Sequence, residues 1–135
     1  MRSGEAFDRL VKIMERLRAD DGCPWDREQT LDTLRAYLME ETYEVLDAIA
    51  SGDVGEHCEE LGDLLFQVVF QSQIRAEEGA FTVADVADAI SDKLERRHPH
   101  VFGDLEGLDR EAIRKNWSDI KAAEKAEKSG GGPPP

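Results

Sequence analysis

The sequence is poor in cysteine and has no long apolar run. Its two cysteines, Cys23 and Cys58, are too few for a disulfide framework and fit a reducing cytoplasm. The densest apolar segment covers only residues 64–70, whereas a membrane-spanning helix needs roughly 20 residues. Residues 1–5 lack the apolar core of a secretory signal. We therefore expect a cytoplasmic protein without a membrane partner.

Basic residues are scarce relative to acidic ones. Seventeen lysines and arginines against 30 aspartates and glutamates give the 135-residue chain a formal net charge of -13. Such a surface repels phosphodiester backbones, so we expect no direct binding to nucleic acid. Alternation of apolar and polar residues is also missing, because the nearest candidate strand, Phe81–Val83, is too short. These two absences leave an acidic, all-α protein as the expected class.

Apolar residues recur at intervals of three and four, which is the spacing of helices with one apolar face. The expected helices cover about residues 4–19, 31–50, 53–79, 82–98 and 109–128. The expected N-caps are Asp26 or Thr30 for the second helix and Asp53, Thr82 and Asp109 for the next three. Short connections favour a four-helix-type bundle with an additional C-terminal helix. The predicted domain spans residues 1–128, and the Gly/Pro tail 129–135 is predicted to be disordered.

The second and third expected helices are apolar over more than one face. The third carries one stripe of Cys58, Leu61, Leu65 and Val68, beside a second apolar run at 64–70. A chain of this size has few ways to cover both faces, so we expect self-association into a homodimer or homotetramer through these helices. A single thick core within one chain is the alternative.

Acidic residues interrupt the apolar face of the second expected helix. With about 3.6 residues per turn, Glu41 shares a face with Leu38 and Val45, where an unpaired carboxylate is costly. Glu44 lies one turn further along, and Glu40 projects about 100° away. The pattern therefore singles out Glu41 as a carboxylate in need of a partner.

The third expected helix carries a matching acidic pair, Glu60 and Asp63, one turn apart. Glu59 competes with Glu60, because Glu59 and Asp63 are also neighbours on a helix. Antiparallel packing of the two helices would bring four carboxylates together, and such a cluster needs a cation to offset its repulsion. Oxygen ligands favour Mg²⁺ first and Mn²⁺ second. Independent solvated acids are the alternative.

The densest positive cluster of the chain ends the fourth expected helix. It consists of Lys93, Arg96, Arg97, His98 and His100. The helix macrodipole explains part of this cluster, because cations are favoured at helix C-termini. On the last helix, Trp117 and Lys121 lie one turn apart and place an aromatic ring and a cation on one face. A carboxylate metal site combined with separate cations is how proteins hold a polyphosphate.

These segments resemble a known family. Residues 40–44 (EETYE), followed after fifteen residues by 60–63 (ELGD), resemble the EExxE…ExxD signature of the MazG-type all-α nucleoside triphosphate pyrophosphohydrolases. The signature alone is shared with dUTPase-like and dCTPase-like relatives. Residues 22–26 (GCPWD) and 92–102 (DKLERRHPHVF) favour the MazG branch, and the resemblance covers about residues 5–125.

The resemblance implies Mg²⁺-dependent hydrolysis of (d)NTPs to (d)NMPs and pyrophosphate, in nucleotide pool cleaning or regulation. It assigns the metal ligands to Glu41, Glu44, Glu60 and Asp63. It assigns nucleotide binding to Lys93, Arg97, Trp117 and Lys121, with Arg96 able to replace its neighbour. An acid outside the metal's ligand shell, Glu40 or Glu44, would accept the proton of the attacking water. Stacking of the base on Trp117 or Trp25 would tolerate any base and predicts broad specificity.

Two alternatives remain open from the sequence. Many members of the family carry two such domains, of which one can lack activity, and this chain holds one copy. A non-catalytic nucleotide-binding or interaction module is therefore the main alternative. A carboxylate-bridged di-iron bundle is less well supported, because its Glu-x-x-His element occurs once here, at Glu95 and His98, instead of twice.

Overall fold

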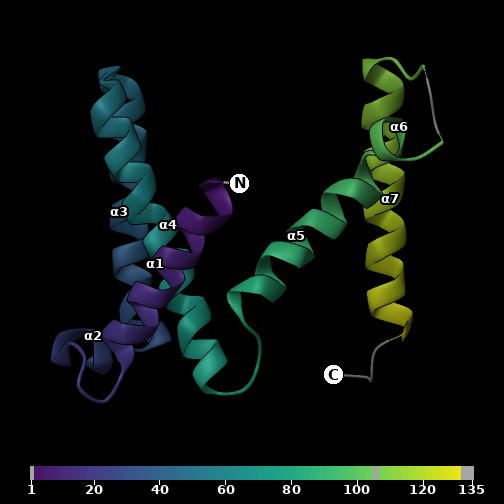
Figure 1. Ribbon diagram of the computed structural model, residues 1–135. Helices are drawn as coiled ribbons and strands as arrows, with labels where there is room; N and C mark the ends of the chain where they lie inside the picture. Colours follow the sequence, from purple (N-terminus) through teal and green to yellow (C-terminus); the bar gives the residue numbers. More distant parts are fainter. Residues whose placement is uncertain (1, 105–106, 132–135) are drawn as a thin grey trace. The chain divides into compact units, whose positions relative to one another are not determined.

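The computed structural model describes residues 2–104 and 107–131, and these residues form seven helices and no strand (Figure 1). The all-α prediction is therefore confirmed. The helices are α1 (Arg2–Arg18), α2 (Pro24–Glu28), α3 (Leu31–Ser51), α4 (Val54–Glu77), α5 (Val83–Arg97), α6 (Pro99–Phe102) and α7 (Arg110–Gly131). None of the helices in the described residues is long and apolar enough to cross a membrane.

The two short helices, α2 and α6, were not expected from the sequence. Both begin with a proline, Pro24 in α2 and Pro99 in α6. A proline ends a preceding helix, but at the first position of a new one its missing N–H costs nothing and its backbone angle is already helical. The predicted breaks before these prolines are correct, and each proline also starts a short helix that the apolar spacing did not indicate.

Helix starts follow the predicted caps. Of the two candidates before α3, Thr30 is the cap, because its Oγ1 accepts a hydrogen bond from Thr33 N at 3.2 Å. Thr33 Oγ1 accepts in return from Thr30 N at 2.8 Å, so both free N–H groups are satisfied. Asp53 caps α4 by accepting from Glu56 N at 3.1 Å. Cap hydrogen bonds are also present at Thr82 and Asp109.

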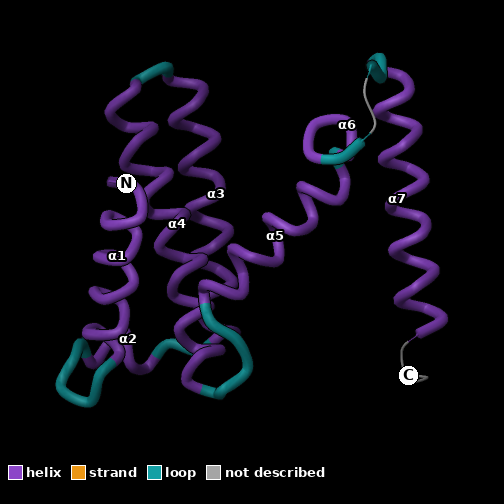
Figure 2. Tube along the Cα trace, turned by 45° about the vertical axis from the view of Figure 1, so that its right-hand side comes forward, coloured by secondary structure: helices purple, strands orange, loops and turns teal. Residues whose placement is uncertain are grey.

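The chain divides into two compact units after Val86. In the first unit, α3 and α4 run side by side in a hairpin, and α1 packs against α4 while α2 packs against α1 (Figure 2). Whether four long helices form one bundle stays a prediction, as does the single domain over 1–128. The end of α7 lies past the predicted Lys128, and the rest of the predicted tail, 132–135, lies outside the described residues.

The core of the first unit lies at the end of the hairpin away from the α3–α4 turn. It consists of Met14, Leu34, Val69, Phe70 and Ile74. In α4 every buried residue lies between positions 67 and 74, so the half of the helix nearer the turn contributes none. Nearer the turn, the buried residues come from α3 alone and are Val45 and Ala48.

The predicted apolar stripe of α4 is not part of this core. Leu61, Leu65 and Val68 are 46%, 41% and 39% exposed, and Cys58 is exposed as well. In α3, Ile49 is 57% exposed, although periodicity placed it on the same face as the buried Leu34. Both helices therefore present apolar side chains at the surface of a single chain.

The second unit contains the C-terminal part of α5 together with α6 and α7. Arg96 and Arg97, at the end of α5, form ion pairs with Glu124 of α7. His98, directly after α5, packs edge to face against Trp117 of α7, with ring centroids 5.3 Å apart. These contacts join residues about 20 to 28 positions apart in the chain. Three of the five predicted nucleotide-binding residues take part in them, namely Arg96, Arg97 and Trp117.

Candidate functional site

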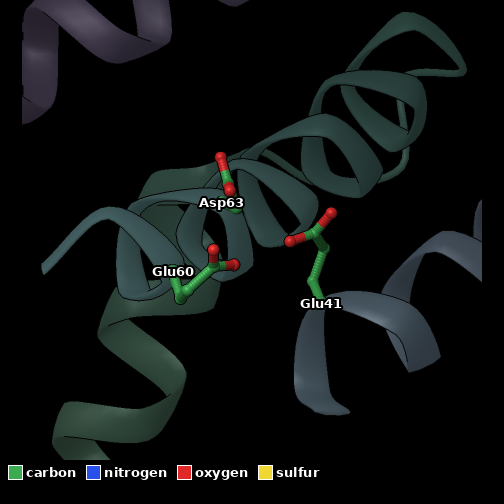
Figure 3. A group of neighbouring side chains, drawn as sticks. All are labelled: Glu41, Glu60 and Asp63. Atoms are coloured by element: carbon green, nitrogen blue, oxygen red, sulfur yellow. The ribbon is translucent and has the colours of Figure 1, made fainter. Parts of the chain in front are cut away.

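Three of the four predicted metal ligands lie together in the first unit. Glu41 projects from α3, and Glu60 and Asp63 project from α4 toward the same space (Figure 3). One carboxylate oxygen of each residue lies within 4.8 Å of the corresponding oxygens of the other two. The predicted meeting of acids from two antiparallel helices is therefore present for these three residues.

The hairpin turn explains why these acids meet. Gly52 ends α3 with a φ of 74°, a left-handed conformation that glycine adopts without steric cost. Glu41 lies eleven residues before Gly52, and Asp63 lies eleven residues after it. Because a helix rises about 1.5 Å per residue, the two carboxylates reach the same level along the hairpin. The tight reversal therefore sets the register of the site.

The acidic cluster raises the pKa of two of its members. Partial burial raises the pKa of Glu41, and the charges of Asp63 and Glu44 raise it further. Partial burial likewise raises the pKa of Glu60, with Asp63 and Glu44 as the strongest charged neighbours. Both shifts mean that the ionised cluster is destabilised in the folded protein and gains from a nearby positive charge.

The three carboxylates fit a divalent cation. Oxygen ligands lie at about 2.1 Å from Mg²⁺, so two ligands of one ion are at most about 4.2 Å apart. The observed limit of 4.8 Å is within a small side-chain rotation of that spacing. A site made only of carboxylate oxygens suits hard ions such as Mg²⁺ and Mn²⁺ better than zinc or copper.

Three further residues line the same open depression, which has a volume of about 570 Å³. Glu40 and Glu44, both exposed, lie at its wall but outside the cluster of three. Tyr43 also lines the depression and was not expected from the sequence. Glu59 does not line it, so the choice that the sequence left open falls on Glu60.

The predicted cations lie in the second unit, where two of them share one partner. Arg96 Nε donates a hydrogen bond to Glu124 Oε2 at 2.6 Å, and Arg97 Nη2 donates to Oε1 at 2.9 Å. These bonds lower the pKa of Glu124 to about 2. Lys93 and Lys121 are exposed and form no ion pair with any residue that the structure describes.

The ring of each tryptophan packs against another aromatic ring. Trp117 is half-buried against His98, and its Nε1 is buried without a hydrogen-bond partner among the described residues. Trp25, in the first unit, is 49% exposed and packs edge to face against Tyr37 at 5.5 Å. The half-burial of Trp117 agrees with a core aromatic as well as with a base-stacking residue.

The di-iron alternative loses support. Within the described ranges, Glu95 and His98 belong to no group of three potential metal ligands. The Nδ1 atom of His98 is instead hydrogen-bonded to Leu94 O at 2.6 Å. The only such group in the described part of the chain is the one at Glu41.

Glu124 was not singled out from the sequence. A signal was present, because Trp117, Lys121 and Glu124 follow one another at intervals of four and three along one face of α7. Its partners lie 27 and 28 residues away, and no local pattern reports such a pairing.

Known proteins are similar to this chain in sequence and in fold. Residues 29–102 match the family described as "MazG nucleotide pyrophosphohydrolase domain", a range that includes the acids, Lys93, Arg96 and Arg97. An Escherichia coli protein named "Nucleoside triphosphate pyrophosphohydrolase" is 55% identical over 124 residues, which are 91% of this chain and 47% of that protein. A Thermotoga maritima protein named "Nucleoside triphosphate pyrophosphohydrolase/pyrophosphatase MazG" is 52% identical over 126 residues, or 93% and 48% of the two chains.

A solved structure is also similar. The crystal structure of a mazG-related protein from Thermotoga maritima aligns with a TM-score of 0.72 and 28% identity, covering 85% of this chain and 98% of that one. The chain spans about half the length of the curated relatives it matches.

Proposed function

The chain belongs to the MazG nucleotide pyrophosphohydrolase family, and we propose that it hydrolyses (d)NTPs to (d)NMPs and pyrophosphate in the presence of Mg²⁺. The observation that carries this proposal is the convergence of Glu41, Glu60 and Asp63 within 4.8 Å at the wall of an open depression. The names of the relatives from Escherichia coli and Thermotoga maritima support the same reaction.

In this proposal Glu41, Glu60 and Asp63, with Glu44 beside them, hold the metal, and Mn²⁺ can replace Mg²⁺. A bound divalent ion neutralises phosphate oxygens and lowers the pKa of a coordinated water. Glu44, which lines the same depression, would complete this ligand set, and Glu40 would then accept the proton of the attacking water.

The cations of the second unit bind the phosphates in this proposal. Lys93, Arg96, Arg97 and Lys121 offset the negative charge of the triphosphate and of the leaving pyrophosphate. Trp117, or alternatively Trp25, stacks on the base. Stacking uses the face that every base presents, so we expect broad base specificity.

We further propose that the protein self-associates as a dimer or tetramer through the α3–α4 apolar face. This face consists of Met39, Tyr43, Leu46, Ile49, Leu61, Leu65 and Val68, each between 39% and 62% exposed in the single chain. Exposed apolar side chains on two neighbouring helices are costly in water and typical of protein interfaces.

Release of pyrophosphate from a panel of canonical (d)NTPs with Mg²⁺ tests the proposed reaction. We expect stoichiometric (d)NMP and pyrophosphate, and none in EDTA. Release of inorganic phosphate with a diphosphate product would contradict the proposal. Nucleotide binding without any product would support the alternative of a non-catalytic module.

A further inference from the structure

Arg96 and Arg97 point to one carboxylate although they are consecutive residues of a helix. Side chains of consecutive helical residues project about 100° apart, so the two guanidinium groups would ordinarily diverge. Here Arg96 Nε and Arg97 Nη2 lie 2.6 and 2.9 Å from the two oxygens of Glu124. Glu124 therefore brings two positive groups together that would otherwise repel each other and separate.

Glu124 leaves most of the donors of the two arginines free. Each guanidinium has five N–H donors, and each donates one hydrogen bond to Glu124 among the described residues. The Nε of Arg97 is buried and has no hydrogen-bond partner in the described ranges. Two arginines and one glutamate also leave a net charge of +1. The remaining donors and charge suit an anion with several oxygen atoms.

The low exposure and the constant charge of Glu124 suit a role in holding the two arginines in place. Its side chain is only 18% exposed, and it lies on the face of α7 that carries Trp117 and Lys121. Its carboxylate stays ionised at every working pH, because the two arginines hold its pKa at about 2. A sheltered, permanently ionised carboxylate holds its partners in a defined geometry better than an exposed one does.

We propose that Glu124 is a positioning residue: it holds the guanidinium groups of Arg96 and Arg97 side by side so that their free N–H groups bind one polyphosphate chain. This inference rests on the proposed function, since it assigns the arginines to the phosphates of the substrate. The opposite role, a carboxylate that competes with the polyphosphate for the arginines, predicts the opposite change in affinity.

The full-length Glu124→Gln variant tests the inference. The dissociation constant for inorganic tripolyphosphate is measured by calorimetry with Mg²⁺, and KM and kcat are measured with one (d)NTP. We expect the dissociation constant and KM to rise about tenfold, the usual effect of losing one charge-assisted partner. We expect kcat to change less than about twofold, because Glu124 itself does not touch the reacting phosphate.

Glu127→Gln is the matched control, because it removes the same charge from an exposed position one turn further along α7. It should leave both constants unchanged. Tighter binding by Glu124→Gln would show that Glu124 competes with the ligand, and unchanged binding would show that it has no role; either result overturns the inference. A parallel loss of kcat and helical circular dichroism would show a purely structural role and also overturn it.

A double-mutant cycle keeps the test decisive if the Gln variant is poorly stable. In a background with Arg96→Ala and Arg97→Ala, Glu124→Gln should have no further effect on the dissociation constant. The outcomes also separate the two proposals. If the wild-type protein binds tripolyphosphate but hydrolyses no (d)NTP, the proposed reaction is wrong. Weaker tripolyphosphate binding by Glu124→Gln would still support the role of Glu124 in that case.

Discussion

Arg18 and Glu77, 59 residues apart in the sequence, join the ends of α1 and α4. Arg18 Nε donates a hydrogen bond to Glu77 Oε2 at 3.0 Å, and Arg18 Nη1 donates to the backbone oxygens of Asp26 and Gln29 at 2.7 and 3.0 Å. One side chain therefore joins α1 to α4, to α2 and to the residue that follows α2.

This pair predicts a pH-dependent contribution to stability. The hydrogen bond from Arg18 lowers the pKa of Glu77 below its ordinary value of 4.5. A lowered pKa in the folded state stabilises the protein above about pH 4.5, and the contribution is lost as the pH falls through the lowered value. We expect Glu77→Gln to cost about 1 kcal/mol of unfolding free energy at pH 7 and much less near pH 3.

Urea denaturation at the two pH values measures this difference. Glu15→Gln, at an exposed position of α1, is the control and should be neutral at both. If Glu77→Gln lowers the free energy of unfolding equally at pH 7 and at pH 3, the charge of Glu77 does not contribute to stability.

The acidic cluster predicts stabilisation by Mg²⁺. Because the pKa values of Glu41 and Glu60 are raised, the metal-free protein should lose stability as the pH rises from about 4.5 through those values. Mg²⁺ at about 100 times its dissociation constant should restore roughly 2.7 kcal/mol. Glu41→Gln should be at least as stable as the wild type in EDTA and should gain little from Mg²⁺.

Thermal melts of both proteins in EDTA and in Mg²⁺ measure these effects. If Mg²⁺ raises the melting temperature of Glu41→Gln as much as that of the wild type, the ion binds elsewhere. Ca²⁺, a larger hard cation, gives a useful comparison because it also prefers carboxylate oxygen.

Two neighbouring glutamates of α4 give a matched catalytic test. Glu60 belongs to the cluster of three carboxylates, whereas Glu59 lies outside the depression. We expect Glu60→Gln to lower kcat at least about 100-fold, because it removes a metal ligand. Glu59→Gln should stay within about twofold of the wild type. Steady-state release of pyrophosphate measures both, and equal effects at the two positions would remove Glu60 from the site.

A charged substitution in the α3–α4 apolar face should lower the molecular mass of the assembly. Leu65, 41% exposed on α4, would lie in the proposed interface. We expect Leu65→Glu to shift the protein from a dimer or tetramer to a monomer, because burying an unpaired charge at an interface is costly. Light scattering after size-exclusion chromatography measures the mass. The control is Ile13→Glu, at a 43% exposed position of α1. A monomeric wild type would refute the proposed assembly directly.

Local features of the chain were predictable in detail. The five long helices and the cap residues Thr30, Asp53, Thr82 and Asp109 follow from apolar spacing and from side chains that accept hydrogen bonds from free N–H groups. The position of Glu41 on an apolar face follows from the helical period alone. These properties depend on residues within one or two turns of each other, so a short stretch of sequence contains all the information they need.

Other features depended on contacts between distant segments. Periodicity offered two apolar faces on α4, and only packing against Met14 and Leu34 selected Val69 and Phe70 for the core. The facing of α4 toward α3 selected Glu60 over Glu59, and the approach of α7 to the end of α5 paired Glu124 with its arginines. A helix can turn any of its faces toward a neighbour without changing its own hydrogen bonds. The sequence by itself therefore determined the five long helices and which acids share a helix. Only the tertiary structure decided which faces are buried and which charges meet.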